Sequence, residues 1–514
     1  MRRLLLPFMF LLPTLWLPPG LQATSVQVTA ASTSSNFRLV GHDPLFARGM
    51  NSAPAMFRHF LYVGNRTDGS ALCVPAQGEP DPSVRNCPHR HPGVLVVDVE
   101  TKHDPKVIGE IGPPLEGNVR ETSRELRVWP QRRLLIVSNF RCSTFYHACP
   151  PPPPTPAPNF RFYDIKGSNA ADPELVSTYS PSIAKLNDPR PHEFFLWIDP
   201  KNPRGRALMY WTTFSDDLRR ANIIVTDISR AREGIFRELA RINVVQFYSQ
   251  DERDNLYVAA HSLSVSPDGT RAHLAVWGGT YLTLDTTDFA DGVDNPRARL
   301  LTPTEDRPFW PNPMAHSAVR VPGRPLVVTT DEIYGDYDDV NDAPFNESGC
   351  PWGWMRVIDV SDDTNPVIVG KYKTEENTRS FCQTPAGQDP DNVTYTSYST
   401  HNPTATPNLV FVTWHSNGLH AVDISDPGNP TTAGVFVPRP LPSVTTEDPA
   451  LSRGTNKVVM WSYPIIKKGL IYVVDIRNGL YILRYTGPHA QEVDDIEFLE
   501  GNSNRGDGAR FDWR

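Results

Sequence analysis

The chain has 514 residues, of which 51 are proline and 21% are charged, and its formal net charge is -8. The proline content is about twice ordinary usage and disfavours long helices. A net negative charge without a basic stripe predicts that nucleic acid is not a partner. The length suggests two or three domains, unless one repeated unit accounts for the whole chain.

The first 23 residues are typical of an export signal. Two arginines precede the apolar run Leu4–Leu17, residues 18–20 break that run, and Ala23 offers a small residue for cleavage. The run is too short and too rich in proline to span a membrane comfortably. We expect a signal peptide at 1–23 and a mature chain that is secreted, periplasmic or extracellular, without a membrane span.

A strand–turn–strand phrase recurs along the chain. Each copy has an apolar strand, a turn that begins at aspartate and often ends in Asn-Pro or Asp-Pro, and a second strand. A phrase that recurs in this way predicts a repeat architecture. The clear copies are 93–109 (GVLVVDVETKHDPKVIG), 353–370 (GWMRVIDVSDDTNPVIVG) and 418–434 (GLHAVDISDPGNPTTAG), and the looser copies are 160–176, 222–239 and 280–301.

Two further strands precede each phrase, which makes an antiparallel unit of four strands. Such units of about 40 residues are the blades of a β-propeller. We predict an all-β fold, a seven-bladed β-propeller within 24–488, followed by a C-terminal tail at 489–514; six or eight blades are the alternatives. The blades are expected near 51–115, 118–180, 190–242, 258–303, 314–374, 399–438 and 456–486.

The last predicted blade has three strands: Val458–Tyr463, Leu470–Asp475 and Leu480–Tyr485. We expect residues 36–48 to supply the fourth strand and to close the ring. Closure of this kind removes exposed strand edges, which otherwise invite aggregation.

The repeated phrases at Val94–Gly109, Arg356–Gly370 and Leu419–Gly434 resemble the LVIVD-repeat family. The resemblance extends over most of 93–485. It implies a β-propeller that is usually exported or associated with the cell surface. It implies little about activity, because a fold does not define a function.

One aspartate ends the strand of each phrase. Its regular place at a turn favours a bond from the carboxylate to the turn backbone over metal binding or acid catalysis. These residues are Asp98, Asp164, Asp227, Asp359 and Asp423.

Six cysteines predict disulfide bonds, because an exported chain meets an oxidising compartment. Six cysteines allow 15 pairings, and proximity in the sequence favours Cys73–Cys87, Cys142–Cys149 and Cys350–Cys382. A zinc site is disfavoured, since the chain has no CxxC pair. The cysteines lie in long insertions that we expect on one face of the propeller, where such loops carry function.

The acidic insertion at 331–352 offers an alternative calcium site at 336–342. Oxygen ligands at short spacing suit this ion, but the EF-hand pattern fails, so a solvated loop is the preferred interpretation. The candidate ligands are Asp336, Asp338, Asp339, Asn341 and Asp342.

Histidines recur at the start of the strand nearest the axis in four consecutive blades. His261, His316 and His401 each lie six residues before a turn proline, and His192 lies eight residues before one. We expect these histidines to converge at the mouth of the central channel. In the second blade Arg124 holds the equivalent position.

Three interpretations of the histidines stay open. Each could cap its strand and bond a neighbouring blade. Together they could ligate a transition metal (Zn²⁺, Cu²⁺ or Fe²⁺), with two neighbours and Glu193 as the ligands if the ring is too wide for four. With Arg124 they could instead hold an anion.

No motif identifies a catalytic nucleophile, and the sequence establishes no cofactor. It therefore predicts an exported, monomeric propeller that binds a protein, a glycan or a small ligand through its loop-decorated face. The alternative is a metalloenzyme with a transition metal at the axis and oxidative or hydrolytic chemistry.

Overall fold

The computed structural model describes residues 31–66, 90–112, 121–141, 160–181, 190–214, 222–255, 258–310, 314–333, 350–392, 394–447 and 454–506. The segment 1–23, four of the cysteines (Cys73, Cys87, Cys142 and Cys149) and the loop 336–342 lie outside these residues.

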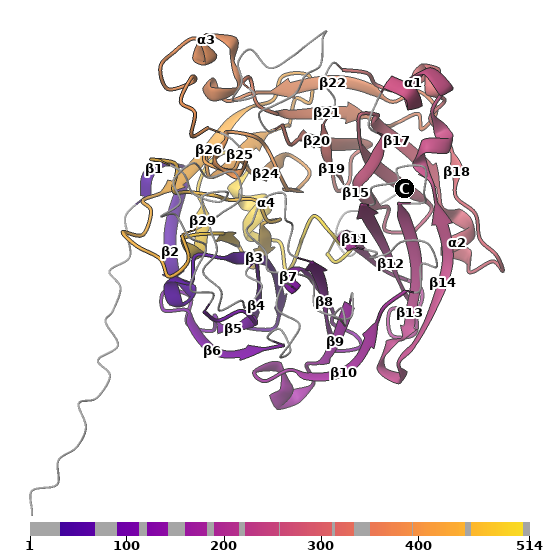
Figure 1. Ribbon diagram of the computed structural model, residues 1–514, viewed down its shortest axis with the longest axis horizontal. Coiled ribbons are helices and arrows are strands. Elements are labelled where there is room, and N and C mark those ends of the chain that lie inside the picture. Colours follow the sequence, from indigo (N-terminus) through magenta and orange to yellow (C-terminus); the bar gives the residue numbers. More distant parts are fainter. Residues whose placement is uncertain are drawn as a thin grey trace, which may run out of the picture.

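Strands dominate the described residues, and they group into antiparallel units of four, of which the first two are joined into one sheet by the pair Asn65–Ser123. Figure 1 shows the units following one another around a central axis in chain order. The predicted all-β fold of four-stranded antiparallel sheets is confirmed. Unit 1 contains β3 (Asn51–Phe57), β4 (Phe60–Asn65), β5 (Val94–Asp98) and β6 (Lys106–Ile111), and unit 2 contains β7 (Glu121–Trp129), β8 (Leu134–Arg141), β9 (Phe160–Asp164) and β10 (Glu174–Tyr179).

The next three units have the same strand order. Unit 3 contains β11 (Arg190–Ile198), β12 (Ala207–Phe214), β13 (Ile223–Arg230) and β14 (Ile235–Ile242). Unit 4 contains β15 (Ala259–Val265), β16 (Arg271–Trp277), β17 (Thr280–Asp285) and β18 (Arg299–Leu300). Unit 5 contains β19 (Ala315–Arg320), β20 (Leu326–Asp331), β21 (Met355–Asp359) and β22 (Val367–Tyr372).

The last two units also include strands from the start of the described chain. Unit 6 contains β23 (Pro403–Ala405), β24 (Leu409–Thr413), β25 (Leu419–Asp423) and β26 (Thr431–Pro438), and β1 (Ala31–Ser35) pairs with β26 at its edge. Unit 7 contains β27 (Ile465–Lys467), β28 (Leu470–Asp475) and β29 (Gly479–Tyr485). The strand β2 (Phe37–Asp43) pairs with β29 along its length, with Phe37 opposite Tyr485.

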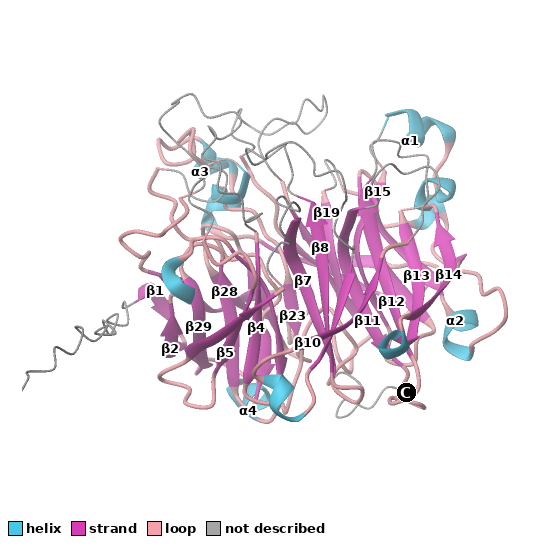
Figure 2. Ribbon diagram, turned by 60° about the horizontal axis from the view of Figure 1, so that its bottom comes forward, coloured by secondary structure: helices cyan, strands magenta, loops and turns pink. Residues whose placement is uncertain are grey.

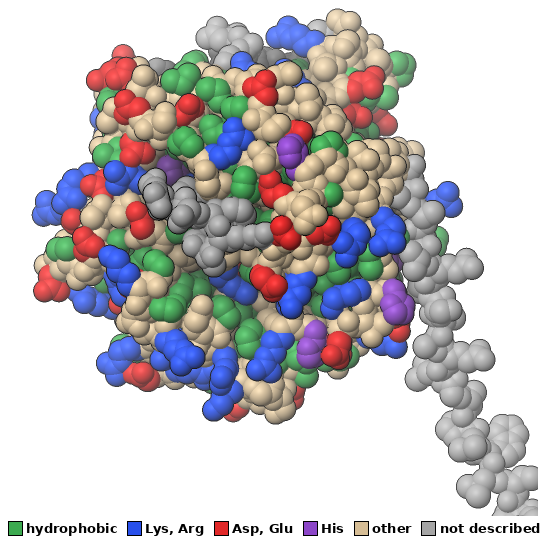
Figure 3. Space-filling model, turned by 180° about the vertical axis from the view of Figure 1, so that it is seen from behind, with side chains coloured by type: hydrophobic (Ala, Val, Ile, Leu, Met, Phe, Trp, Pro, Cys, Tyr) green, Lys and Arg blue, Asp and Glu red, His purple; other side chains and the backbone are tan. Residues whose placement is uncertain are grey.

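The helices are short and lie at the two ends of the strands. Figure 2 shows α1 (Gln250–Asn255) and α3 (Arg379–Cys382) at one end, and α2 (Thr287–Asp291) and α4 (Ala490–Asp494) at the other. No helix among the described residues is both long enough and apolar enough to cross a membrane. On the face that Figure 3 shows, basic and acidic side chains are interspersed.

The first strand predicted for the last unit is wrong in its position. The strand β27 spans Ile465–Lys467, whereas within 458–463 Met460 makes isolated bridges to Asp475 and His415. The register from Ile465 opposite Tyr472 would place Ser462, not Met460, opposite Asp475. Two extra residues therefore interrupt the ladder, next to Pro464, which has no N–H to donate.

A hydrophobic cluster fills each interface between neighbouring units. Strands with both faces against a neighbour are buried on both sides, which explains their almost continuous apolar sequences. The cluster between units 1 and 7 contains Met56, Leu61, Tyr472 and Ile482. The other six interfaces are filled in the same way.

The repeated aspartates bond the turn backbone, as predicted. Asp98 accepts a hydrogen bond from the N–H of Glu100, and Asp359 accepts one from the N–H of Ser361, both at 2.8 Å. The same bond forms at Asp164, Asp227 and Asp423. These carboxylates are therefore parts of turns.

The segment that was expected as a tail crosses the centre of the molecule. Leu499 bonds Ile466 of unit 7, Gly501 donates to Thr404 of unit 6, and Asn502 accepts from Leu196 of unit 3 and from Arg127 of unit 2. Leu196 lies four residues beyond His192 along β11, about 13 Å at the rise of a strand. The crossing therefore lies below the histidines along the axis.

Candidate metal centre

The predicted site residues lie at irregularities in the first strands. The register of β15 shifts between Ala260 and Ser262, at His261, and that of β19 shifts between Ala315 and Ser317, at His316. The strand β11 shifts around His192 and Glu193, and β7 shifts at Arg124. A bulge re-aims the side chain of its extra residue. Recurring bulges thus turn these side chains out of the sheets and toward the axis.

The backbone carbonyls that the bulges free are bonded by hydroxyls of the preceding unit. Thr212 donates to His261 O at 2.8 Å, Ser262 donates to His316 O at 2.6 Å, and Thr330 donates to His401 O at 2.5 Å. A contact between units therefore recurs at these positions through the backbone carbonyl. For His401 the imidazole also takes part, since its Nδ1 lies 2.5 Å from Trp461 O.

The structure brings all four predicted histidines into one row. The ring centroids of His192 and His261 are 4.4 Å apart, and those of His316 lie 3.8 Å from both His261 and His401. His192 Nε2 and His261 Nε2 are 2.9 Å apart. His261, His316 and His401 are buried, and His192 is half-buried.

Two members of the cluster, Glu332 and His415, were not identified from the sequence. The Oε1 atom of Glu332 lies 3.0 Å from His401 Nε2 and 3.5 Å from His415 Nε2. Its Oε2 atom lies 3.5 Å from His316 Nε2. One buried carboxylate therefore faces three imidazoles with its two oxygens.

A signal for these two residues exists in the second strands. Leu326 and Leu409 pair with the repeated aspartates Asp359 and Asp423, and Glu332 and His415 follow six residues after each leucine. The end of a second strand lies beside the start of the first strand in an antiparallel sheet. Alignment of the second strands would have placed both residues at the level of the histidines.

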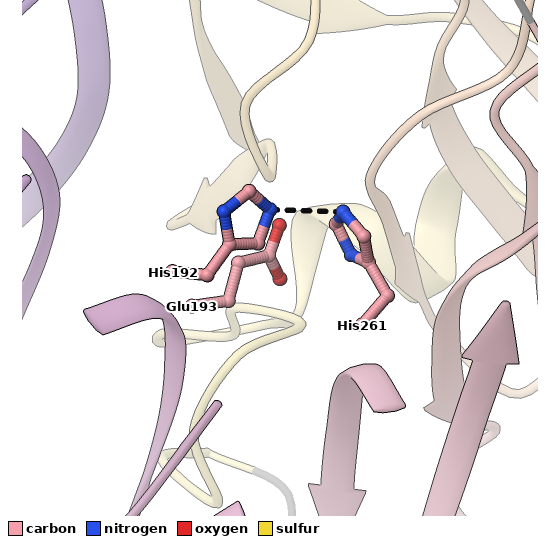
Figure 4. Close-up of side chains that lie close together, drawn as sticks. All are labelled: His192, Glu193 and His261. Atoms are coloured by element: carbon pink, nitrogen blue, oxygen red, sulfur yellow. Dashed lines mark hydrogen bonds between the residues drawn. The ribbon is translucent and has the colours of Figure 1, made fainter. Parts of the chain in front are cut away.

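Glu193 lies beside the row, between the histidines and the crossing segment. Figure 4 shows its carboxylate pointing toward the imidazoles of His192 and His261. Its Oε1 atom is 3.5 Å from His316 Nε2, and its Oε2 atom accepts a hydrogen bond of 3.3 Å from Tyr463.

The nitrogen and oxygen atoms of the cluster that could bind a metal form three overlapping groups. In each group these atoms are no more than 4.8 Å apart. His261 belongs to the first and second groups, and Glu332 to the second and third. The groups are His192, Glu193 and His261; His261, His316 and Glu332; and Glu332, His401 and His415.

Burial shifts the pKa values of several groups in the cluster. It lowers the pKa of His261 to about 3 and that of His415 to about 4, and it holds the pKa of His316 well below the usual range. Burial acts to raise the pKa of Glu332, but His401 and His316 outweigh it and hold that pKa well below the usual range. Metal binding requires the neutral form of an imidazole and the ionised form of a carboxylate, and these directions favour both forms at His316 and Glu332.

Glu193 differs from Glu332. Burial, and then the neighbouring Glu125, raise the pKa of Glu193 well above its usual range. A cation bound at this carboxylate would compete with a proton, because a metal ligand has to be deprotonated.

The predicted Arg124 lies next to the row. Its guanidinium carbon is 5.7 Å from the ring centroid of Trp461, and that ring is 5.2 Å from His401. Its charge adds to burial in lowering the pKa of His192 and of His261. A positive charge therefore stands beside neutral imidazoles.

The predicted pair Cys350–Cys382 is joined by a disulfide bond, with a Cα–Cα distance of 5.6 Å. The bond ties the connection between β20 and β21 to the segment that follows β22. Both sulfurs are buried against Trp352.

Comparison with known families identifies a repeat in two parts of the chain. Residues 351–374 and 406–437 match the model of the LVIVD repeat. The chain carries LVIVD repeats. The two matched segments contain two of the three clear phrases found in the sequence, so the predicted resemblance is confirmed.

No curated protein matches the chain. Solved structures with a similar chain path include Sqt1 of Saccharomyces cerevisiae, at 8% identity and a TM-score of 0.43. The match covers 89% of this chain and 99% of the Sqt1 chain. The β-propeller domain of Cps50 (Swd1) from Myceliophteria thermophila has 10% identity and a TM-score of 0.43, with 88% and 98% coverage. A protein from Lactobacillus plantarum has 13% identity and a TM-score of 0.41, with 76% and 85% coverage.

Proposed function

We propose that this LVIVD-repeat protein is an exported, metal-dependent β-propeller, and that its axial cluster of histidines and glutamates binds a divalent transition metal. The observation that carries the proposal is the Glu332 carboxylate, which is buried among the Nε2 atoms of His316, His401 and His415. Buried ionisable groups are costly unless they are paired or coordinate a metal.

Packing alone does not account for the histidines. The same bulge position is Arg124 in unit 2, and the corresponding shift in β3 of unit 1 surrounds Ser52 and Ala53. In unit 2 the bulge and its carbonyl contact form without an imidazole, since Ser52 donates to the carbonyl oxygen of Arg124. At this position histidine occurs in four consecutive units, 3 to 6. This favours a role at one place on the axis over a structural role in every unit.

The donor set points to a class of metal. Imidazole nitrogen and carboxylate oxygen suit Zn²⁺, Fe²⁺ or Cu²⁺. Such an ion, when bound, supplies a Lewis acid or an activated water for hydrolytic or oxidative chemistry. Seven ligand residues are more than one ion takes, and the two oxygens of Glu332 face different histidines, so we expect one or two ions for each chain.

Metal analysis tests the proposal. Full-length protein, exported and purified without metal-affinity resin or chelator, is analysed by inductively coupled plasma mass spectrometry. We expect about one or two equivalents of a transition metal, and a loss of most of it in E332Q and H316Q.

The matched control is H273Q. His273 is buried in β16 against Tyr281, outside the cluster, so this variant should keep its metal. Wild-type protein that stays metal-free after incubation with each candidate ion, or folded E332Q and H316Q variants that keep full metal content, would contradict the proposal.

We also propose that the units are the seven blades of one closed propeller, with β2 as the last strand of the seventh. The hydrophobic clusters at all interfaces, including that between units 1 and 7, support a closed ring. A scaffold role that binds a partner through the loop-decorated face is the second candidate function. The disulfide that anchors two insertions at that face favours it.

A further inference from the structure

Arg66 occupies in unit 1 the position that Glu332 occupies in unit 5. Phe60 pairs with the repeated Asp98, and Arg66 follows six residues later, as Glu332 follows Leu326. The backbone bonds agree. Arg66 N donates to Met50 O and Glu332 N donates to Met314 O, both at 3.0 Å. The fold therefore places Arg66 in the same ring of positions as the proposed metal ligands Glu332 and His415.

The guanidinium of Arg66 is buried without a carboxylate partner among the described residues. Arg66 is only 3% exposed. Its Nη2 donates to the Tyr395 hydroxyl at 3.0 Å, while Nε and Nη1 have no hydrogen-bond partner in the described part of the chain. The carbon of the guanidinium lies 4.5 Å from the Tyr395 ring centroid and 5.0 Å from that of Trp461. Buried donors without partners are costly, and more so when charged.

The same two rings connect Arg66 to the histidine row. Tyr395 lies 5.5 Å from His415, and Trp461 lies 5.2 Å from His401, as ring centroids. The guanidinium of Arg124 also faces Trp461. Units 1 and 2 thus direct two cations toward the centre, opposite the ligand atoms of units 3 to 6.

We propose that Arg66 and Arg124 form an oxyanion subsite, which holds a carboxylate, sulfate or phosphate group of a ligand beside the axial metal centre. The inference deepens the proposed function and rests on it for the neighbouring metal. Arginine suits this role because its planar fork of N–H donors matches the oxygens of such groups. Both guanidiniums face the ring of Trp461, at 5.0 Å for Arg66 and 5.7 Å for Arg124 from its centroid.

Calorimetric titration tests the subsite with simple probes. Sodium sulfate, sodium phosphate and sodium acetate are titrated separately into full-length protein at constant ionic strength, and the three affinities distinguish the sources of the anionic group. We expect at least one of them to bind, and R66M to weaken that binding about 10- to 100-fold, the range of a hydrogen bond to a charged group. Methionine keeps an apolar stem against Tyr395 and Trp461, and R66K should retain part of the affinity.

The matched control is R58M, because Arg58 is exposed at the turn between β3 and β4, at the other end of unit 1. R58M should bind the anion as wild type does. If R66M does not fold, R124M and R66K carry the test, and both should weaken binding. No binding of any of the three anions to wild type, or equal affinity in folded Arg66 and Arg124 variants, would overturn the inference.

Metal content, measured on the same samples, separates this inference from the proposed function. Arg66 is not a proposed ligand, so R66M should keep its metal. Anion binding that depends on Arg66 in protein without metal supports the subsite and contradicts the metal centre. Full metal content without anion binding supports the metal centre and contradicts the subsite.

Discussion

His420 is a buried imidazole that lies away from the axial cluster. Its ring packs 5.2 Å from Trp414 and 6.4 Å from Tyr372, and its Nε2 lies 3.2 Å from Asn417 O. Burial lowers its pKa to about 4, although the bond to the carbonyl opposes this. The folded protein therefore keeps this imidazole neutral at pH values at which an unfolded chain takes up a proton.

The expected result is a loss of stability at mildly acidic pH. As the pH falls from about 6.5 to 4, the unfolded state binds the proton and the folded state does not, so the free energy of unfolding decreases by up to about 3 kcal/mol. Above about pH 6.5 His420 is neutral in both states, and this loss of stability is absent. Urea unfolding of wild type and H420F at several pH values checks this, because H420F lacks the effect. A constant difference between the two proteins over this range would show that His420 does not titrate as described.

At the residue scale the sequence identified six of the nine side chains around the axis and missed three. The spacing from the turn prolines aligned His261, His316 and His401 at one level, because that spacing counts residues along one strand. Glu332, His415 and Arg66 lie at the ends of second strands, and they meet the histidines only through pairing between strands. To align these three residues, one has to know which residue of each second strand pairs with the repeated aspartate.

At the scale of elements, the Cys350–Cys382 bond joins two connections of unit 5. It closes a loop with a sequence separation of 32. In the chain-entropy model a loop of this length stabilises the folded state by about 3 to 4 kcal/mol. We expect the double variant C350A/C382A to lose about this free energy of unfolding in denaturant and to retain its metal, since neither sulfur is a proposed ligand. An unchanged denaturation midpoint would argue against the bond as a stabilising element.

Two elements could not be predicted from their own sequences. The first strand of unit 7 is interrupted near Pro464, and the pairing of Met460 with Asp475 depends on two extra residues that no phrase indicates. The crossing segment 499–504 (LEGNSN) has no alternation of apolar and polar residues. It is held by hydrogen bonds to units 2, 3, 6 and 7, so its path depends on the units around it.

At the scale of the whole molecule, the pairing of β2 with β29 joins the start of the described chain to unit 7. Phe37 belongs to the cluster between units 6 and 7, and Leu45 to that between units 1 and 7. We expect a variant that lacks residues 24–48 to aggregate or to unfold at a much lower temperature, because it loses both contacts and exposes the edge of β29.

The control for this deletion lacks residues 24–35. It removes β1 from the edge of unit 6 but leaves β2 in place, so it should remain monomeric and folded in size-exclusion chromatography and thermal unfolding. Equal stability of the two truncated proteins would contradict the closure of the ring by β2.

The most direct test of the central claim is anomalous X-ray diffraction from crystals of metal-loaded protein, measured on both sides of the absorption edge of the metal found by analysis. The account predicts an anomalous peak at the axis, at about 2.0–2.2 Å from imidazole Nε2 atoms of the row and from an oxygen of Glu332. Crystals of loaded protein with no peak among His261, His316, Glu332, His401 and His415, or with a peak elsewhere, would contradict it.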